Sequence, residues 1–201
     1  MINIGVLASG RGSNLQAVMD AIDSQYIKNA RIAIVISNKE DAIALERARK
    51  HNIPAIFVDP KKFADRQVYD QEMAKKLEEH KVELVLLAGY MRILSPEFVR
   101  HFGGRLMNIH PALLPSFPGL HPQRDALEWG VKVTGCTVHF VTEDVDRGPI
   151  ILQYPVPVKK GDTEEGLAQR ILEKEHKIFP KAVRLYAEGR LRIVGRRVEV
   201  L

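Results

Sequence analysis

The segment 105–110 reads as a short strand that ends in two polar side chains suited to acyl-transfer chemistry. Asn108 and His110 are two residues apart, so in a strand they project from one face while Ile109 points to the other. If the strand is parallel to its neighbours, both side chains lie at its carboxyl end, where open α/β sheets bind ligands. An amide and an imidazole can both donate to a tetrahedral oxyanion, and the imidazole can also transfer a proton. The same pattern is compatible with a histidine that only caps the strand.

An acidic turn between two expected strands could supply a partner for His110. It spans 142–149 and carries Glu143, Asp144 and Asp146. A carboxylate beside an imidazole favours the protonated, cationic ring that a general acid needs. The spacing does not choose among the three acids, and solvated turn acids without a partner fit the pattern as well.

The segment 9–14, Ser-Gly-Arg-Gly-Ser-Asn, joins the first expected strand to the first expected helix. Glycine lets the backbone approach a ligand, and the free N–H groups and dipole of a helix start favour an anion. A dinucleotide fingerprint would need Gly or Ala where Leu15 stands, and an acidic residue at 36–38, which reads Ile-Ser-Asn. No Gly-Lys-Ser/Thr follows either. We therefore predict a site for a single phosphate, with Ser13 and Asn14 as additional donors; the alternative is a glycine turn that only lets the helix pack closely.

The other histidines and the cysteine do not indicate a metal site or a second catalytic site. His51, His80 and His101 lie near expected helix ends and are expected to be solvated, whereas His139 alternates with apolar residues and is expected on a strand face. The chain lacks HExxH, CxxC and other clustered metal ligands, so we expect no metal. It also lacks the Gly-x-Ser-x-Gly elbow of one class of serine hydrolases. Cys136 is expected to be a small core residue.

Alternating strand-like and helix-like segments surround these residues. The expected strands span 2–8, 31–36, 55–58, 82–87, 105–110, 133–141 and 150–158. The expected helices span 15–22, 41–50, 65–79, 96–100, 124–129 and 162–186. We predict an α/β fold with a mostly parallel twisted sheet flanked by helices and antiparallel additions in the C-terminal half. The segment 191–200 is expected to form a terminal hairpin, and Asp162 with Glu165 to cap the last helix.

Length and composition restrict the class of protein. The chain has 201 residues, 45% of them hydrophobic and 27% charged, which is typical of one globular domain. One cysteine excludes an internal disulfide framework and fits a reducing compartment, and the N-terminus lacks the pattern of a signal peptide. The most apolar run, 84–91, has about half the length of a membrane span. The formal charge of +5 is spread evenly, without basic runs interleaved with aromatics, so we expect a cytoplasmic protein that binds neither nucleic acid nor membranes.

Four segments in this order resemble one known enzyme family. They are Ser9–Gln16, Leu87–Leu94, Asn108–Pro115 and the turn Asp146-x-Gly148-Pro149. Over nearly its whole length the chain resembles the phosphoribosylglycinamide formyltransferases, the folate-dependent formyltransferases of purine synthesis. The last two segments are specific to the formyltransferase superfamily, and the glycine loop narrows the resemblance to this member. It implies the Rossmann-like formyltransferase fold as a single domain, with 1–100 as the ribonucleotide phosphate-binding half and 101–201 as the catalytic and folate-binding half.

The resemblance also implies a reaction. The amine of 5-phosphoribosylglycinamide would attack the formyl carbon of 10-formyltetrahydrofolate, a cosubstrate, with no metal involved. Asn108 and His110 would stabilise the oxyanion, His110 would act as general acid, and Asp146 would keep it protonated. The enzyme would be a monomer or a homodimer.

The binding residues are likewise implied by the resemblance. Those for the ribonucleotide are Gly12, Ser13, Asn14 and Glu175. Those for the folate are Arg66, Met91, Arg92, Ile93, Leu94, Asn108, Thr142, Glu143, Asp144, Val145 and Asp146. Arg11 fills a slot that varies within the family, where it would either add to phosphate binding or point to solvent.

Three alternatives remain at this point. A formyltetrahydrofolate hydrolase resembles this domain but usually carries an N-terminal regulatory domain, for which we expect no room here. A methionyl-tRNA formyltransferase adds a C-terminal tRNA-binding domain, whereas only a short segment follows the last long helix. A non-catalytic sugar-phosphate or folate binding module would keep the phosphate loop but would not need Asn108, His110 and Asp146 together.

Overall fold

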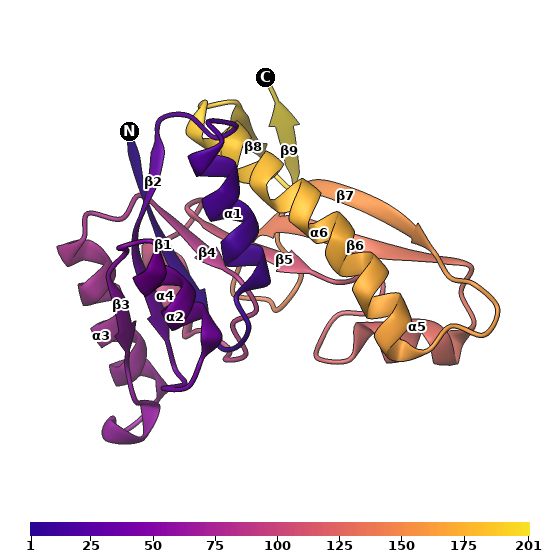
Figure 1. Cartoon of the computed structure of the whole chain (residues 1–201), viewed down its shortest axis with the longest axis horizontal. Helices are drawn as coiled ribbons and strands as arrows, with labels where there is room; N and C mark the ends of the chain where they lie inside the picture. Colours follow the sequence, from indigo (N-terminus) through magenta and orange to yellow (C-terminus); the bar gives the residue numbers. More distant parts are fainter.

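The computed structural model describes residues 1–201 and places all nine strands in one sheet, in the order β3-β2-β1-β4-β5-β6-β7-β9-β8 (Figure 1). The strands are β1 (Ile2–Ala8), β2 (Ala30–Ser37), β3 (Ala55–Phe57), β4 (Leu84–Leu87), β5 (Leu106–His110), β6 (Val133–Phe140), β7 (Ile150–Pro157), β8 (Leu191–Val194) and β9 (Arg197–Val200). The helices are α1 (Ser13–Asp23), α2 (Ile43–Lys50), α3 (Arg66–Glu79), α4 (Pro96–His101), α5 (Pro122–Trp129) and α6 (Glu164–Ala187), with a short 3₁₀ turn, η1 (Pro60–Lys62).

The sheet is parallel in its N-terminal part and antiparallel in its C-terminal part. The strands from β3 to β5 run parallel, whereas β6 is antiparallel to β5, and β7 to β6. The terminal hairpin β8–β9 joins the β7 edge through β9. All four residues of β4 are buried, as expected of a parallel strand covered on both faces. The predicted fold class is therefore confirmed.

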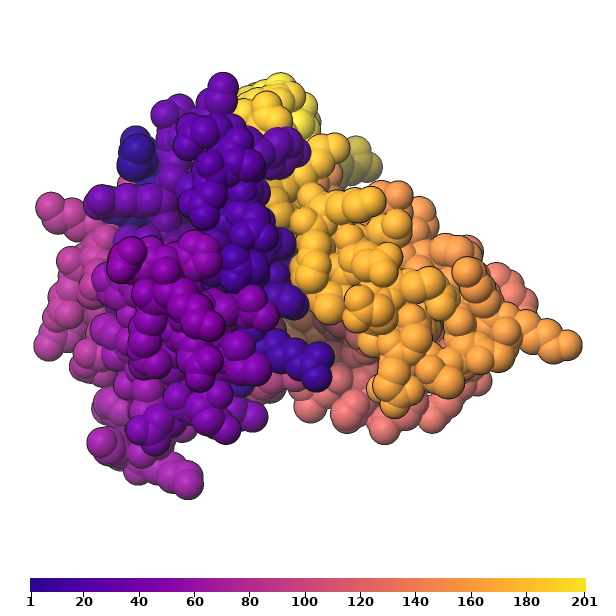
Figure 2. Space-filling view, viewed as in Figure 1, coloured from indigo at the N-terminus to yellow at the C-terminus, as the bar shows by residue number.

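Helices cover both faces of the sheet, and each face has its own apolar core. One cluster of 31 buried residues joins α1, α2 and α6 to one face, and a second cluster of 15 joins α3 and α4 to the other. Helices α1 and α6 lie side by side in Figure 1 and pack against each other. Figure 2 shows the same seam, where the indigo N-terminal surface meets the yellow-orange surface of α6. Residues of α6 therefore lie close to the first loop.

The direction in which successive strands are added to the sheet reverses between β1 and β4. From β1 the chain continues to β2 and β3 on one side, whereas β4 and β5 lie on the other. The loops that follow β1 and β4 start next to each other, because the Ser9 amide donates to the Gly89 carbonyl at 3.1 Å. Ligands of open α/β sheets bind at such a switch point, outside the carboxyl ends of the strands. The fold thus places two of the four resembling segments, 9–16 and 87–94, at the expected ligand-binding edge.

The start of α6 differs from the prediction. Thr163, not Asp162, is the N-cap: its hydroxyl accepts a hydrogen bond from the Gly166 amide at 3.1 Å. Asp162 instead accepts from the guanidinium of Arg170 and from the Lys159 amide. These donors lower the pKa of the Asp162 carboxyl to about 2. The prediction that Asp162 caps α6 was wrong by one residue, because the Asp162 carboxylate binds Arg170, about two turns further along the chain.

Cys136 is a buried free cysteine in β6, as predicted, and burial raises the pKa of its thiol to about 12. None of the helices combines the length and the apolar composition that crossing a membrane requires.

Candidate active site

Asn108 and His110 lie near and at the carboxyl end of β5, as the strand period predicts. His110 is 4% exposed and Asn108 is half-buried, while Ile109 between them belongs to the apolar core. The Nε2 atom of His110 lies 2.8 Å from the Phe117 carbonyl oxygen. A carbonyl can only accept, so Nε2 carries a proton and donates it. The imidazole therefore binds the loop that follows its strand.

The loop after His110 is fixed by β6. The Thr137 hydroxyl donates to the Ala112 carbonyl at 2.7 Å and accepts from the Leu114 amide at 3.1 Å. Thr137 is fully buried and stands opposite His110 in the register of β5 and β6. Two backbone groups of the loop are thus tied to the strand next to β5, which holds the loop over the imidazole.

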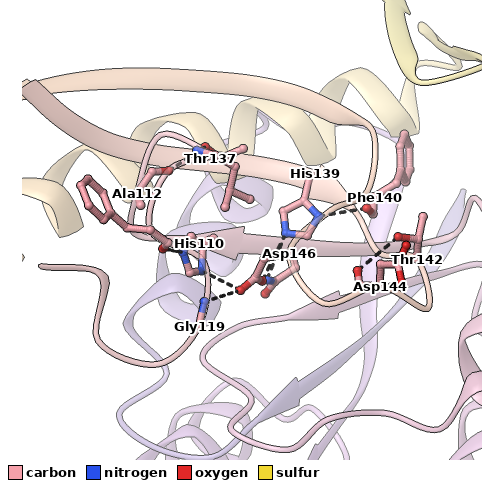
Figure 3. A network of polar contacts seen from close by, with 12 residues as sticks. His110, Ala112, Gly119, Thr137, His139, Phe140, Thr142, Asp144 and Asp146 are labelled. Carbon is pink, nitrogen blue, oxygen red and sulfur yellow. Dashed lines mark hydrogen bonds and ion pairs between the residues drawn. The ribbon is translucent and has the colours of Figure 1, made fainter. Parts of the chain in front are cut away.

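Asp146 is the acid that reaches His110. Its Oδ2 atom lies 3.6 Å from His110 Nδ1 and accepts a hydrogen bond from the Gly119 amide at 2.9 Å. The 142–149 turn starts at the opposite end of β5, because the Val141 amide donates to the Leu106 carbonyl. It then returns along the strand, so that the Asp146 carboxylate lies between two histidines (Figure 3). The structure chooses Asp146 from three acids that sequence spacing could not separate.

Both ring nitrogens of His110 face oxygen acceptors. Its Nε2 faces a carbonyl and its Nδ1 faces a carboxylate, and both are pure acceptors. The Asp146 side chain is only 10% exposed, so water screens its charge weakly. This arrangement provides a proton donor inside the site.

His139 is a site residue that the sequence did not single out. It is 1% exposed, and its Nδ1 donates to the Phe140 carbonyl at 2.9 Å. Burial lowers the pKa of His139, although the Phe140 carbonyl and the charge of Asp146 act in the opposite direction. The ring is therefore neutral, and its Nε2 accepts from the Asn108 amide at 3.3 Å. The expected strand-face position is correct, and the register of β5 and β6 places His139 directly opposite Asn108.

We expect His139→Phe to lower kcat about fivefold, because the Asn108 side-chain amide loses the acceptor that orients it, at a cost of about 1 kcal/mol. The affinity for both substrates should change little, since no charge is removed. The measurement is steady-state kinetics at pH 7.5. A kcat equal to that of the unmodified chain would show that the Asn108 orientation does not depend on His139.

The first loop is shaped by close packing as well as by an open helix end. Gly12 is the N-cap of α1 with φ +67°, and a Cβ there would lie 2.7 Å from the Cβ of Ala44 in α2. Gly12 therefore lets α2 pack closely, which is the alternative that the sequence left open for this glycine. No side chain caps α1, so its first amide groups remain available to an anion.

A surface pocket of about 400 Å³ lies beside this helix end. It is lined by Ser13, Gln16, Ala17, Asp20, Arg47 and His176. The Arg47 guanidinium donates to the Arg11 carbonyl at 2.8 Å and to Gln16 at 3.1 Å, so it fixes the loop and adds a positive charge. Arg47 belongs to α2, and nothing in its sequence position marked it as a neighbour of the loop. Arg11 is exposed.

Asn14 and Glu175 meet across the seam between α1 and α6. The side-chain amide of Asn14 donates to Glu175 Oε2 at 2.8 Å, and both side chains are buried, at 8% and 6% exposure. Burial raises the pKa of the Glu175 carboxyl, and the bond from Asn14 partly offsets this effect. The side-chain oxygen of Asn14, Oδ1, has no hydrogen-bond partner. The structure thus brings together two expected ribonucleotide residues that are 161 positions apart.

Most residues expected on the folate side lie in the loop after β4 and in the 142–149 turn. Met91, Ile93 and Val145 are 64%, 61% and 50% exposed, so their apolar side chains have no cover within the chain. Unpaired apolar side chains that cluster near polar groups are typical of ligand sites. Leu94 is buried. The remaining members are Arg66, Arg92, Thr142, Glu143 and Asp144.

The charged members of this set have different roles. Arg66 is exposed at the start of α3 and its side chain makes no hydrogen bond or ion pair within the chain. The structure therefore leaves it free but does not join it to His110 or Asp146. Glu143 is paired with Arg100 at 2.9 Å, which holds the 142–149 turn against α4. Thr142 donates to the Asp144 carbonyl at 3.3 Å and stabilises the same turn.

Known proteins resemble this chain in both sequence and fold. The family model described as formyl transferase matches residues 2–183. The phosphoribosylglycinamide formyltransferase of Escherichia coli (strain K12) is 48% identical over 192 residues, which are 96% of this chain and 90% of that protein. The chain belongs to the formyl transferase family. Within it, the relatives named phosphoribosylglycinamide formyltransferase are similar over nearly their full length.

Two further relatives agree with this assignment. The glycinamide ribonucleotide transformylase 1 of Symbiobacterium toebii has 55% sequence identity and a TM-score of 0.98, over 100% of this chain and 94% of that one. The trifunctional purine biosynthetic protein adenosine-3 of Drosophila pseudoobscura pseudoobscura is 54% identical over 96% of this chain, which spans only 14% of that protein. The predicted family and fold are therefore confirmed, and the family uses 10-formyltetrahydrofolate as its cosubstrate.

Proposed function

We propose that this formyl transferase moves the formyl group of 10-formyltetrahydrofolate to the amine of 5-phosphoribosylglycinamide, a step of purine (IMP) synthesis. The observation that carries the proposal is the catalytic trio: Asn108 and His110 on β5, with Asp146 at 3.6 Å from the imidazole. The similarity to named phosphoribosylglycinamide formyltransferases supports the same substrates. A binding module without catalysis would have no need for a buried imidazole between two acceptors.

The chemistry assigned to the trio is a direct transfer. The substrate amine attacks the formyl carbon, and the carbonyl oxygen becomes an oxyanion that accepts from the Asn108 amide and the His110 imidazolium. The His110 Nε2 proton now points at the Phe117 carbonyl, so the substrate oxygen would take the place of that acceptor. The bond from the formyl carbon to N10 of the folate then breaks. N10 gains one proton and the amine loses one, so the products are the formylated ribonucleotide and tetrahydrofolate.

The ribonucleotide half of the site distinguishes transfer from hydrolysis. We assign the phosphate to Gly12, Ser13 and Asn14 at the start of α1, and the ribose hydroxyls to the Glu175 carboxylate. Support comes from the uncapped helix end, the adjacent Arg47 and the Asn14–Glu175 contact. A formyltetrahydrofolate hydrolase would release formate without the ribonucleotide. The test is a spectrophotometric folate assay with and without 5-phosphoribosylglycinamide: transfer requires it, and equal turnover without it would favour the hydrolase.

Ser13→Ala is expected to raise the KM for the ribonucleotide about fivefold to tenfold, because one donor to the phosphate is lost. The KM for the folate should change less than twofold. Gly12→Val is a poor test of phosphate binding, since the new side chain would collide with Ala44 and disturb α2. A matched control is Ser24→Ala at the other end of α1. Equal increases of both KM values in a folded Ser13→Ala variant would argue against a dedicated phosphate site.

We also propose that the chain works in the cytoplasm as a monomer or a homodimer. The trio, the first loop and Glu175 all belong to one chain, so a partner is not needed to complete the proposed site. Residues 1–100 would supply the phosphate loop, and residues 101–201 the catalytic trio and most of the folate-binding turn. Each half would also contribute to the other substrate, through Glu175 in one case and the segment 91–94 in the other.

A further inference from the structure

The segment 91–94 is held in place at both ends by groups outside it. The Met91 amide donates to the Ser9 hydroxyl at 2.9 Å, and Ser9 in turn donates to Asn38 at 2.6 Å. The Ser95 amide, directly after the segment, donates to Asp70 Oδ2 at 2.5 Å. Met91 and Ile93 are exposed, yet the backbone at either end of the segment is bonded to Ser9, directly after β1, and to Asp70 of α3.

Helix α3 contributes two adjacent residues to this arrangement. The Arg92 guanidinium lies over the Tyr69 ring, 4.9 Å from its centroid, so the arginine side chain packs on α3. Asp70 follows Tyr69 and is only 2% exposed. Burial raises the pKa of the Asp70 carboxyl, whereas its bonds to Ser95 and the charges of Arg92 and Arg66 lower it.

We propose that Asp70 is a positioning residue that fixes the backbone of the 91–94 segment for binding of the folate cosubstrate. The inference rests on the proposed function, because it takes this segment to be part of the folate site. Asp70 touches neither substrate in this proposal and acts through the Ser95 amide.

Asp70 does not cap helix α3. Its N-cap is Asp65, whose carboxylate accepts from the Val68 amide at 2.9 Å. A buried carboxyl in the middle of a helix face is costly unless it is hydrogen-bonded. The hydrogen bond that the structure gives to Asp70 is with Ser95, which also caps α4 by accepting from the Phe98 amide. Asp70 therefore serves the junction between the segment 91–94 and α4.

The test compares Asp70→Ala and Asp70→Ser with Asp70→Asn. The first two side chains cannot reach the Ser95 amide, so the KM for 10-formyltetrahydrofolate should rise at least about tenfold. The KM for the ribonucleotide and the kcat at saturating folate should stay within about twofold. Asp70→Asn keeps an oxygen acceptor of the same reach and should recover most of the folate affinity. Asp70→Ser serves where Asp70→Ala fails to fold.

A control and a second measurement separate this role from general stability. Asp65→Ala removes the N-cap of the same helix and should lower Tm without changing the ratio of the two KM values. Calorimetric titration with tetrahydrofolate measures binding alone and is informative even if the unmodified chain shows no formyl transfer, the result that would sink the proposed function. If folded Asp70→Ala or Asp70→Ser binds tetrahydrofolate as tightly as the unmodified chain, or if Asp65→Ala shows the same selective loss, the role of Asp70 is overturned.

Discussion

Replacing Asn108 by Ala is expected to lower kcat on the order of 100- to 1000-fold, the usual cost of losing one oxyanion donor. His110→Ala should lose at least as much, since the imidazole supplies both a donor and the transferable proton. Both side chains occupy the carboxyl end of β5, where the amide is oriented by His139 and the ring by Phe117 and Asp146. The effect should appear in kcat, with both substrates still bound.

A histidine elsewhere in the chain provides a control for the His110 variant. His80→Ala removes an imidazole at the end of α3 whose hydrogen bond is to the Lys76 carbonyl, away from the site, so it should leave kcat unchanged. The measurement is steady-state kinetics together with calorimetric binding of each substrate. Near-normal turnover in Asn108→Ala or His110→Ala would remove that residue from the mechanism.

Much of the fold is predictable from local patterns because they agree with the tertiary structure. Apolar segments such as β4 require cover on both faces, and alternation of strands and helices requires crossovers in a parallel sheet. The two-residue period of β5 was enough to place Asn108 and His110 on one face. These features depend on neighbours in the sequence, which single-sequence reasoning can evaluate.

The rest of the site depends on contacts between distant segments. Asp146 could not be separated from Glu143 and Asp144 by spacing. Its position follows from the path of the 142–149 turn, which starts beside Leu106 and returns toward Gly119. The function of His139 depends on the register of β5 against β6, which fixes it opposite Asn108. The family resemblance selected Asp146 where residue spacing alone could not.

Sequence patterns were also incomplete at helix starts. Gly12 was expected to serve a ligand, and the structure gives it a packing role against Ala44 as well. The N-cap of α6 moved from Asp162 to Thr163 because Asp162 has a stronger partner in Arg170. In both cases the side chains that decide the outcome lie outside the motif itself.

Asp146→Asn is expected to produce a large fall in kcat near neutral pH, on the order of 100-fold or more. The change keeps the size of the side chain and removes its charge, so the Gly119 amide can still donate to it. Without the carboxylate, the negative charge 3.6 Å from the ring that carries the transferable proton is lost. The reaction needs that proton before the bond to N10 breaks.

A second variant separates the charge of Asp146 from its position. Asp146→Ala removes the charge and also the acceptor of the Gly119 amide. If the charge carries the effect, Asp146→Asn and Asp146→Ala should lose kcat to a similar extent, while the KM values for both substrates change little. If Asp146→Asn keeps near-normal kcat and only Asp146→Ala loses activity, Asp146 acts instead by holding the loop at Gly119, the folate or an ordered water.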